Sequence, residues 1–171
     1  MEEKLIYKGN IFTLAHKDVQ IHGQCFPRDI IHHPGGVGIV VIVDHKILLV
    51  RQYRHAIEKE SIEIPAGKLE YGEDPVQCAV RELNEETGYD CDKLEFIQSF
   101  VTTPGFCDER IWLFEAVHPF LAENRLAPDA DEDIHKQWMD LDEAYQYIRS
   151  GVIDDAKSVI AIQYAALKER R

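Results

Sequence analysis

Hydrophobic and polar residues follow two patterns, which divide the chain into strand-like and helix-like parts. Short runs rich in β-branched and aromatic residues predict strands, and turn-forming residues such as His22 and Gly23 separate them. Residues 37–43 are almost continuously apolar, which is typical of a strand covered on both faces of a sheet. The predicted strands are residues 5–7, 12–21, 26–31, 37–43, 47–50, 94–101, 111–117 and 136–139.

The clearest helix is predicted between Asp74 and Thr87. Asp74 is a favourable N-cap, Pro75 suits the first helical position, and Gly88 suits the C-terminal cap. Apolar side chains recur at helical spacing and are expected to face a core; they are Val76, Ala79, Val80, Leu83 and Thr87. Two further helices are predicted over residues 141–150 and 155–169. Helices that cover a mixed sheet give an α/β or α+β fold class.

The composition is that of a globular protein, with 45% hydrophobic and 29% charged residues, and 171 residues predict one compact domain. The 31 acidic and 19 basic residues give a formal net charge of -12, which disfavours nucleic acid as a partner and favours cations. No apolar run is long enough for a membrane helix, and no secretory signal is predicted at the start. With four scattered cysteines, a cytoplasmic protein with reduced thiols is expected, and a zinc site is disfavoured.

Three carboxylates share one face of the predicted helix, beside its apolar stripe. Glu82, Glu85 and Glu86 lie at helical spacings, where like charges repel one another and also oppose the helix dipole near its C-terminal end. One interpretation is a solvated acidic face on which Arg81 pairs with Glu85. The other is a site for a hard divalent cation, which prefers carboxylate oxygen and would reverse the repulsion.

The residues around this helix favour the metal site, because they resemble the Nudix box, G-x5-E-x7-R-E-U-x-E-E-x-G-U, where U is a bulky aliphatic residue. Leu83 fits the first U, whereas Tyr89 departs from the aliphatic form at the last one. Every fixed position is matched, by Gly67, Glu73, Arg81, Glu82, Glu85, Glu86 and Gly88.

The resemblance implies a loop–helix–loop motif within an α/β/α sandwich, and hydrolysis of nucleoside diphosphates linked to another group. It implies that Glu82, Glu85 and Glu86 bind Mg²⁺, with Mn²⁺ as a substitute. Gly67 is expected to permit a tight turn that brings the Ala66 carbonyl towards a metal ion. Two further residues of the motif, Glu73 and Arg81, are expected to orient the loop and the helix through charge-assisted hydrogen bonds.

Residues outside the box are similar to those of the ADP-ribose pyrophosphatase branch of the family. The similarity extends over residues 51–54, residues 63–67, Pro104, the N-terminal strands and residues 155–171, so it covers nearly the whole chain. Arg54 ends a predicted strand, where its guanidinium could hold a phosphate, and Arg51 is a second substrate candidate. Glu63 is a candidate for a metal-bound water or a ribose hydroxyl. The alternatives are an exposed arginine at position 54 and an ordinary strand-edge carboxylate at position 63.

Three more positions are candidates for contacts with the substrate. Pro104 could wall the sugar end of the pocket, and Phe12 or Tyr7 could stack on adenine, although a core aromatic is the commoner role. In this branch an acidic loop often supplies a glutamate that positions or deprotonates the attacking water. Glu132 is the candidate for this base, with Glu109 as the alternative.

The sequence therefore predicts an enzyme that hydrolyses ADP-ribose to AMP and ribose 5-phosphate with Mg²⁺. The alternatives are hydrolysis of another nucleoside diphosphate sugar (ADP-mannose, GDP-mannose) or of a dinucleotide, and a non-catalytic module that binds a nucleotide sugar. Residues 1–33 are too few to bury a core alone, and their exposed strand edges favour pairing. In the resembled branch this segment exchanges between subunits, so a homodimer is expected, with residues 34–171 forming the hydrolase domain.

Overall fold

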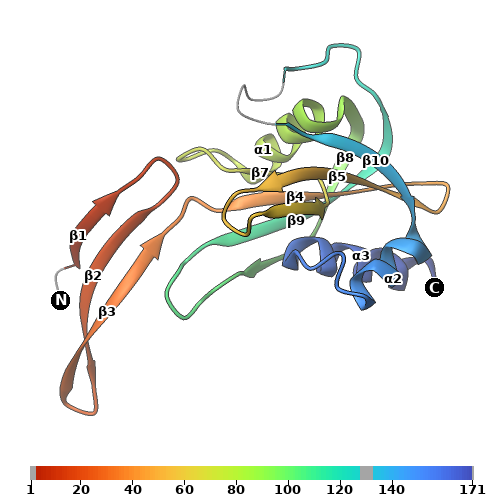
Figure 1. Ribbon diagram of the computed structural model, residues 1–171. Coiled ribbons are helices and arrows are strands. Elements are labelled where there is room, and N and C mark those ends of the chain that lie inside the picture. The colour runs from red at the N-terminus through yellow and green to blue at the C-terminus, as the bar shows by residue number, and fades with distance from the viewer. Residues whose placement is uncertain (1–2, 128–132, 171) are drawn as a thin grey trace.

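A small antiparallel sheet forms the N-terminal part of the computed structural model, which describes residues 3–127 and 133–170. Its order is β1 (Glu3–Lys8), β2 (Thr13–Ile21) and β3 (Gln24–His32), as the sequence predicted. His22 and Gly23 both have positive φ, which suits the two-residue turn that joins β2 to β3. Figure 1 shows this sheet projecting from one side of the main body.

The main body is built on a mixed sheet. Across this sheet the strands follow the order β10 (His135–Asp140), β5 (Lys46–Arg54), β4 (Gly36–Val43), β9 (Arg110–Leu121) and β8 (Tyr89–Val101). The pair β4–β9 is parallel and the other pairs are antiparallel. Two short strands, β6 (Lys59–Glu63) and β7 (Ala66–Lys68), pair with β5 and β4.

Helices cover both faces of this sheet, which confirms the predicted sandwich (Figure 1). On one face lies α1 (Pro75–Glu82), and on the other lie α2 (Leu141–Arg149) and α3 (Ala156–Glu169). Alternate residues of β4 enter the two cores: Ile39 packs on the α1 side and Val40 on the side of α2 and α3. This division explains why residues 37–43 are apolar without alternation. Within the described residues, no helix is long and apolar enough to span a membrane.

The central helix follows the prediction at its ends but not along its apolar stripe. Ala79, Leu83 and Thr87 are buried as expected, whereas Val76 and Val80 are 42% and 40% exposed. The buried face of the helix instead includes Cys78 and two acidic residues, Glu82 and Glu86. In addition, the last turn is a π-helix, η1 (Leu83–Thr87), rather than a continuation of the α-helix.

Strands β4 and β5 diverge, and β6 and β7 lie between them. These two short strands were not predicted, because no clear apolar run marks them in the sequence. The β4–β5 pairing covers only the residues next to their connecting turn. Further along, β7 pairs with Gly36–Gly38 of β4 while β6 pairs with the end of β5. The Ile39 N–H donates to the Pro65 carbonyl between them. This insertion sets the β6–β7 connection beside the central helix.

Candidate active site

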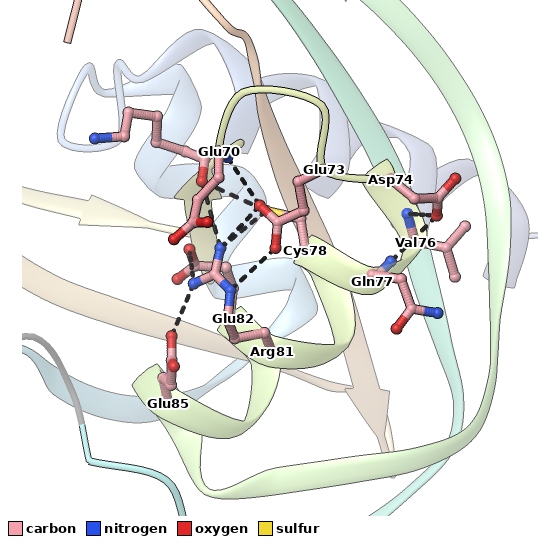
Figure 2. Close-up of polar contacts among 10 residues, drawn as sticks. Glu70, Glu73, Asp74, Val76, Gln77, Cys78, Arg81, Glu82 and Glu85 are labelled. Carbon is pink, nitrogen blue, oxygen red and sulfur yellow. Dashed lines mark hydrogen bonds and ion pairs between the residues drawn. The ribbon is translucent and has the colours of Figure 1, made fainter.

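Local capping fixes the start and the end of the helix that carries the acidic residues. The Asp74 carboxylate accepts hydrogen bonds from the N–H groups of Val76 (2.9 Å) and Gln77 (3.3 Å), as Figure 2 shows. At the other end Gly88 adopts the left-handed conformation with a φ of 69°. Lys136 donates to the Thr87 carbonyl at 2.6 Å, so a cation offsets part of the negative end of the helix dipole.

Gly67 allows the helix and β7 to approach each other at Glu82. A Cβ atom at position 67 would lie 1.8 Å from the Glu82 Cδ atom, so any side chain there collides with the carboxylate. Gly67 pairs with Val37 within the sheet and does not have a positive φ. Residue 67 lies within β7, and the structure requires a glycine there for close approach to Glu82. The approach of the Ala66 carbonyl to a metal ion stays a prediction.

Arg81 joins three carboxylates into one network (Figure 2). Its Nε and Nη2 atoms donate to the two oxygens of Glu73 at 3.1 and 3.2 Å. Its Nη1 atom donates to Glu82 at 2.7 Å and to Glu85 at 2.9 Å. Partial burial acts to lower the pKa of Arg81, but these carboxylates raise it well above its usual value. The guanidinium therefore stays charged and ties the loop before the helix to the acidic face.

The carboxylates of the helix are largely shielded from solvent, unlike those of a solvated acidic face. Glu82 and Glu86 are 8% and 4% exposed. Glu86 accepts a hydrogen bond from the Ala66 N–H at 2.9 Å, which holds residue 66 of the β6–β7 connection against the helix. Because one guanidinium serves three carboxylates here, the donor set is rich in hard anionic oxygen. This chemistry fits Mg²⁺ or Mn²⁺, which would be held by Glu82, Glu85, Glu86 and the Ala66 carbonyl.

Two of the substrate candidates contact each other beside this centre. Arg54 donates to both Glu63 oxygens, from Nε and Nη2, at 2.7 Å each. Glu63 is only 2% exposed and also accepts a hydrogen bond from Lys157. Burial alone would raise the pKa of Glu63, but the hydrogen bonds and charges of Arg54 and Lys157 lower it to about 2. Glu63 is thus an ionised, buried carboxylate with two cationic partners.

Arg51 is not brought together with Arg54. The two residues are three apart on β5, so they point to opposite faces of the strand. Arg51 donates to Glu60 at 2.6 Å. It lines a small pocket of about 190 Å³ together with Gln52, Tyr53, His55, Glu60, Asp133 and His135.

The remaining candidates lie on other segments. Phe12 lies in the connection between β1 and β2, where its ring centroid is 6.0 Å from that of Tyr7. Pro104 is exposed in the turn between β8 and β9. Glu109 accepts a hydrogen bond from Thr102 at 2.6 Å, near the junction with the N-terminal sheet. Glu132 lies outside the described residues.

Some residues that hold the site together were not among the site candidates from the sequence. Lys157 and Ser158 of α3 reach the β6–β7 connection from 94 residues away. Asn84, at a variable position of the motif, accepts from the Leu126 N–H and donates to the Asn124 carbonyl. In the sequence, only the N-cap pattern at the start of α3 could have indicated that the first turn of this helix has a fixed conformation.

A second group of possible metal ligands lies at the other end of β4. It contains His45, Asp140 and Asp142, all exposed. Asp140 caps α2, and His45 is paired with Glu169 and with Asp142. These contacts account for the group without a metal ion.

The chain is similar to known proteins along nearly its whole length. The chain is 47% identical to a "Methanol dehydrogenase activator" of Bacillus methanolicus, covering 96% of this chain and 90% of the relative. It is 42% identical to an "ADP-ribose pyrophosphatase" of Bacillus subtilis (strain 168), covering 99% and 95%. A crystal structure of an "ADP compounds hydrolase" has the same fold, with a TM-score of 0.84 at 21% identity over 99% of this chain and 94% of that one. The NUDIX domain model matches residues 32–160, and the chain therefore belongs to the Nudix family.

Proposed function

We propose that this protein is a metal-dependent pyrophosphatase that hydrolyses ADP-ribose to AMP and ribose 5-phosphate. The observation that carries the proposal is the gathering of Glu82, Glu85 and Glu86 at one helix end, where Glu82 and Glu86 are buried and Ala66 is hydrogen-bonded to Glu86. The name of the relative from Bacillus subtilis, an ADP-ribose pyrophosphatase, supports the substrate. Mg²⁺ is the proposed metal, with Mn²⁺ as a substitute.

The residues of this chain have distinct roles in the proposed reaction. Glu82, Glu85, Glu86 and the Ala66 carbonyl would hold the metal. When bound, the metal neutralises pyrophosphate charge and makes a water molecule more acidic. Arg54 binds a phosphate oxygen, and a loop carboxylate, Glu132 or alternatively Glu109, accepts the proton of the water. Of the other candidates, Arg51, Pro104 and Phe12 contact the substrate, while Gly67, Glu73, Arg81 and Gly88 keep the motif in shape.

The helix that carries Glu82, Glu85 and Glu86 is called the metal helix below. Its proposed role is tested by the variants Glu82→Gln and Glu85→Gln, which remove charge but keep side-chain volume. Loss of a metal ligand is expected to reduce turnover of ADP-ribose by about 100-fold or more. Glu143→Gln, in the exposed first turn of α2, is a matched control and should keep full activity. AMP release measured by chromatography decides the question. Wild-type turnover that survives EDTA, or full activity in both variants, would contradict the proposal.

Other nucleoside diphosphate sugars are the nearest alternative substrates. A relative from Cronobacter sakazakii, 29% identical over 98% of this chain, is named a GDP-mannose pyrophosphatase. A panel of ADP-ribose, ADP-mannose, GDP-mannose and a dinucleotide, with identification of the products, ranks these substrates by kcat/KM. Stoichiometric binding of ADP-ribose in Mg²⁺ without AMP release would instead favour a non-catalytic binding module.

Activation of a dehydrogenase is a second candidate function, because a relative 47% identical over nearly the whole chain carries that name. Addition of the protein to a methanol dehydrogenase assay tests it. If activation requires the hydrolase site, Glu82→Gln should abolish it, whereas Glu143→Gln should not. An unchanged dehydrogenase rate with wild-type protein would exclude this function for the enzyme tested.

A homodimer formed through residues 1–33 is also part of the proposal. The N-terminal sheet exposes several apolar side chains, namely Leu5, Ile6, Tyr7 and Ile11, which are 51–58% exposed. Such a patch favours association, and β1 is a free strand edge in the described chain. Analytical ultracentrifugation should give a dimer, and a monomer at micromolar concentration would contradict it. A cytoplasmic location is proposed because all four cysteines are free thiols.

A further inference from the structure

The first turn of α3 contacts the β6–β7 connection, although it lies far from the Nudix box in the sequence. Asp155 caps this helix, and its Oδ2 atom accepts hydrogen bonds from the N–H (3.0 Å) and the hydroxyl (2.6 Å) of Ser158. Ser158 is fully buried. Its hydroxyl orientation is therefore fixed, which leaves its oxygen available as an acceptor on the other side.

Two successive residues of α3 hold the last residue of β6 and the residue that follows it. The Lys157 ammonium donates to the Glu63 carboxylate, and the Ile64 N–H donates to the Ser158 hydroxyl at 2.8 Å. Two residues later, the Ala66 N–H donates to Glu86. Residues 63–66 are consequently held by α3 at one end and by the metal helix at the other.

Glu63 in turn fixes the guanidinium of Arg54. Both bonds come from the Nε–Nη2 edge, so the planar group cannot rotate without breaking them. No hydrogen bond within the described residues uses Nη1, and the Arg54 side chain is 41% exposed. A guanidinium held along one edge presents its remaining donors in a set direction, which is what binding of a phosphate oxygen requires.

Lys157 makes this arrangement compatible with burial of Glu63. Its side chain is 13% exposed, and its other carboxylate partner is Asp155 at 3.1 Å. With Lys157 bound to one oxygen of Glu63, the carboxylate has a fixed plane and is neutralised by more than one cation. Without Lys157, Arg54 would be the cationic partner left to Glu63, and the pair could rotate together.

We propose that Lys157 and Ser158 are positioning residues for the pyrophosphate site: Lys157 orients Arg54 through Glu63, and Ser158 orients Ala66 through Ile64. This inference rests on the proposed hydrolase function. Neither residue touches the substrate, so each acts through the residue that it holds. The two therefore have separable effects, with Lys157 acting on substrate binding and Ser158 on metal binding.

The test compares Lys157→Met with Lys157→Arg in the full-length protein at saturating Mg²⁺. Loss of the ammonium should raise the KM for ADP-ribose about tenfold, the equivalent of one charge-assisted hydrogen bond, with kcat changed less than about twofold. Arginine should restore most of the loss. Lys59→Met is the matched control, because Lys59 pairs with Asp154 just before α3 at 2.5 Å and is 45% exposed. It should keep the wild-type KM.

Ser158→Ala tests the second half of the proposal. It leaves the buried Ile64 N–H without its acceptor, so the segment leading to Ala66 should shift. Binding of Mn²⁺ without substrate, measured by electron paramagnetic resonance, should weaken severalfold in this variant and remain unchanged in Lys157→Met. A purely structural role would lower the melting temperature of both variants while leaving KM and the Mn²⁺ affinity unchanged, and would overturn the inference. If Lys157→Met fails to fold, Glu63→Gln should give the same increase in KM.

Failure of this inference can be distinguished from failure of the proposed function. Wild-type hydrolysis with equal KM in wild-type and Lys157→Met proteins would overturn the inference alone. If the wild-type protein binds ADP-ribose in calorimetry but releases no AMP, the proposed function fails. In that case the inference still predicts about tenfold weaker binding in Lys157→Met, and equal binding would overturn it.

Discussion

Substitution of Gly67 by alanine is the sharpest test of how the acidic helix is held against the sheet. The new Cβ would lie 1.8 Å from the Glu82 Cδ and 1.9 Å from its Oε1. Carbon atoms not bonded to each other normally stay about 3.5 Å or more apart, so the carboxylate must move by roughly 2 Å. Because residue 67 has an ordinary backbone conformation, alanine itself adds no main-chain strain.

The two consequences of this movement differ greatly in size. Displacing Glu82 breaks its 2.7 Å hydrogen bond with Arg81, which corresponds to about 1–2 kcal/mol of the free energy of unfolding. For a chain of this length that lowers the melting temperature by a few degrees. If Glu82 holds the metal as proposed, its misplacement by about 2 Å should in contrast reduce turnover by roughly 100-fold or more. Gly67→Ala is therefore predicted to be folded but nearly inactive.

Paired measurements of the melting temperature, Mn²⁺ affinity and ADP-ribose turnover test this prediction. Gly151→Ala is the control, because Gly151 has a φ of 74° and no atom within 4 Å of an added Cβ. It should lose about 1 kcal/mol of stability and keep its activity. In a Glu82→Ala background, Gly67→Ala should weaken Mn²⁺ binding little further. Folded Gly67→Ala protein with wild-type Mn²⁺ affinity, or additive losses in the double variant, would refute the reasoning.

Three further predictions concern stability. Asp74→Ala should lower the free energy of unfolding by about 1 kcal/mol in urea titrations, and an unchanged value would show that the cap contributes little. Hydrogen bonds to Asp108 and Glu3 raise the pKa of His32 above 6.5, so its stabilising charge is complete below that pH and is lost as pH rises through the raised value. The stability gap between wild type and His32→Gln should therefore shrink as the pH rises from 6.5 through the raised pKa, and a constant gap would contradict this. Lys136→Met should lower the melting temperature by a few degrees because it uncaps the metal helix, and no change would refute that role.

Features that depend on neighbouring residues were predictable from the sequence. The Asp74 cap, Pro75 and Gly88 set the limits of the central helix, and the apolar run of residues 37–43 indicated a strand between two helical layers. Each of these signals is local, because a cap bonds within its own turn and a doubly covered strand shows in its own composition.

The exposure of Val76 and Val80 shows where the hydrophobic pattern fails. The pattern assigns the buried face to apolar residues, but this helix buries Glu82 and Glu86. A carboxylate is kept out of water only where partners compensate it, and those partners come from the β6–β7 connection and from Arg81. The π turn then changes the angular spacing after Glu82, which no helical wheel with a constant step can follow.

Contacts between segments that lie far apart in the chain could not be predicted from the sequence. Glu63 was expected near a ribose or a metal-bound water, with a strand-edge carboxylate as the alternative. Its burial depends on Lys157, 94 residues further along the chain. No spacing rule links a strand end to the first turn of the last helix, since their meeting follows from how α3 packs on the sheet.

The guanidinium groups of Arg81 and Arg54 are held in the same way but have different roles. In each, Nε and Nη2 are bound to one glutamate: Glu73 for Arg81 and Glu63 for Arg54. The Nη1 atom of Arg81 bonds to one oxygen each of the proposed metal ligands Glu82 and Glu85, so a bound metal ion would share these carboxylates with the guanidinium. Glu73 holds the opposite edge of this guanidinium. Arg54 has no such acceptor at Nη1 within the described residues, so its free edge is ready for the anion that accompanies the metal.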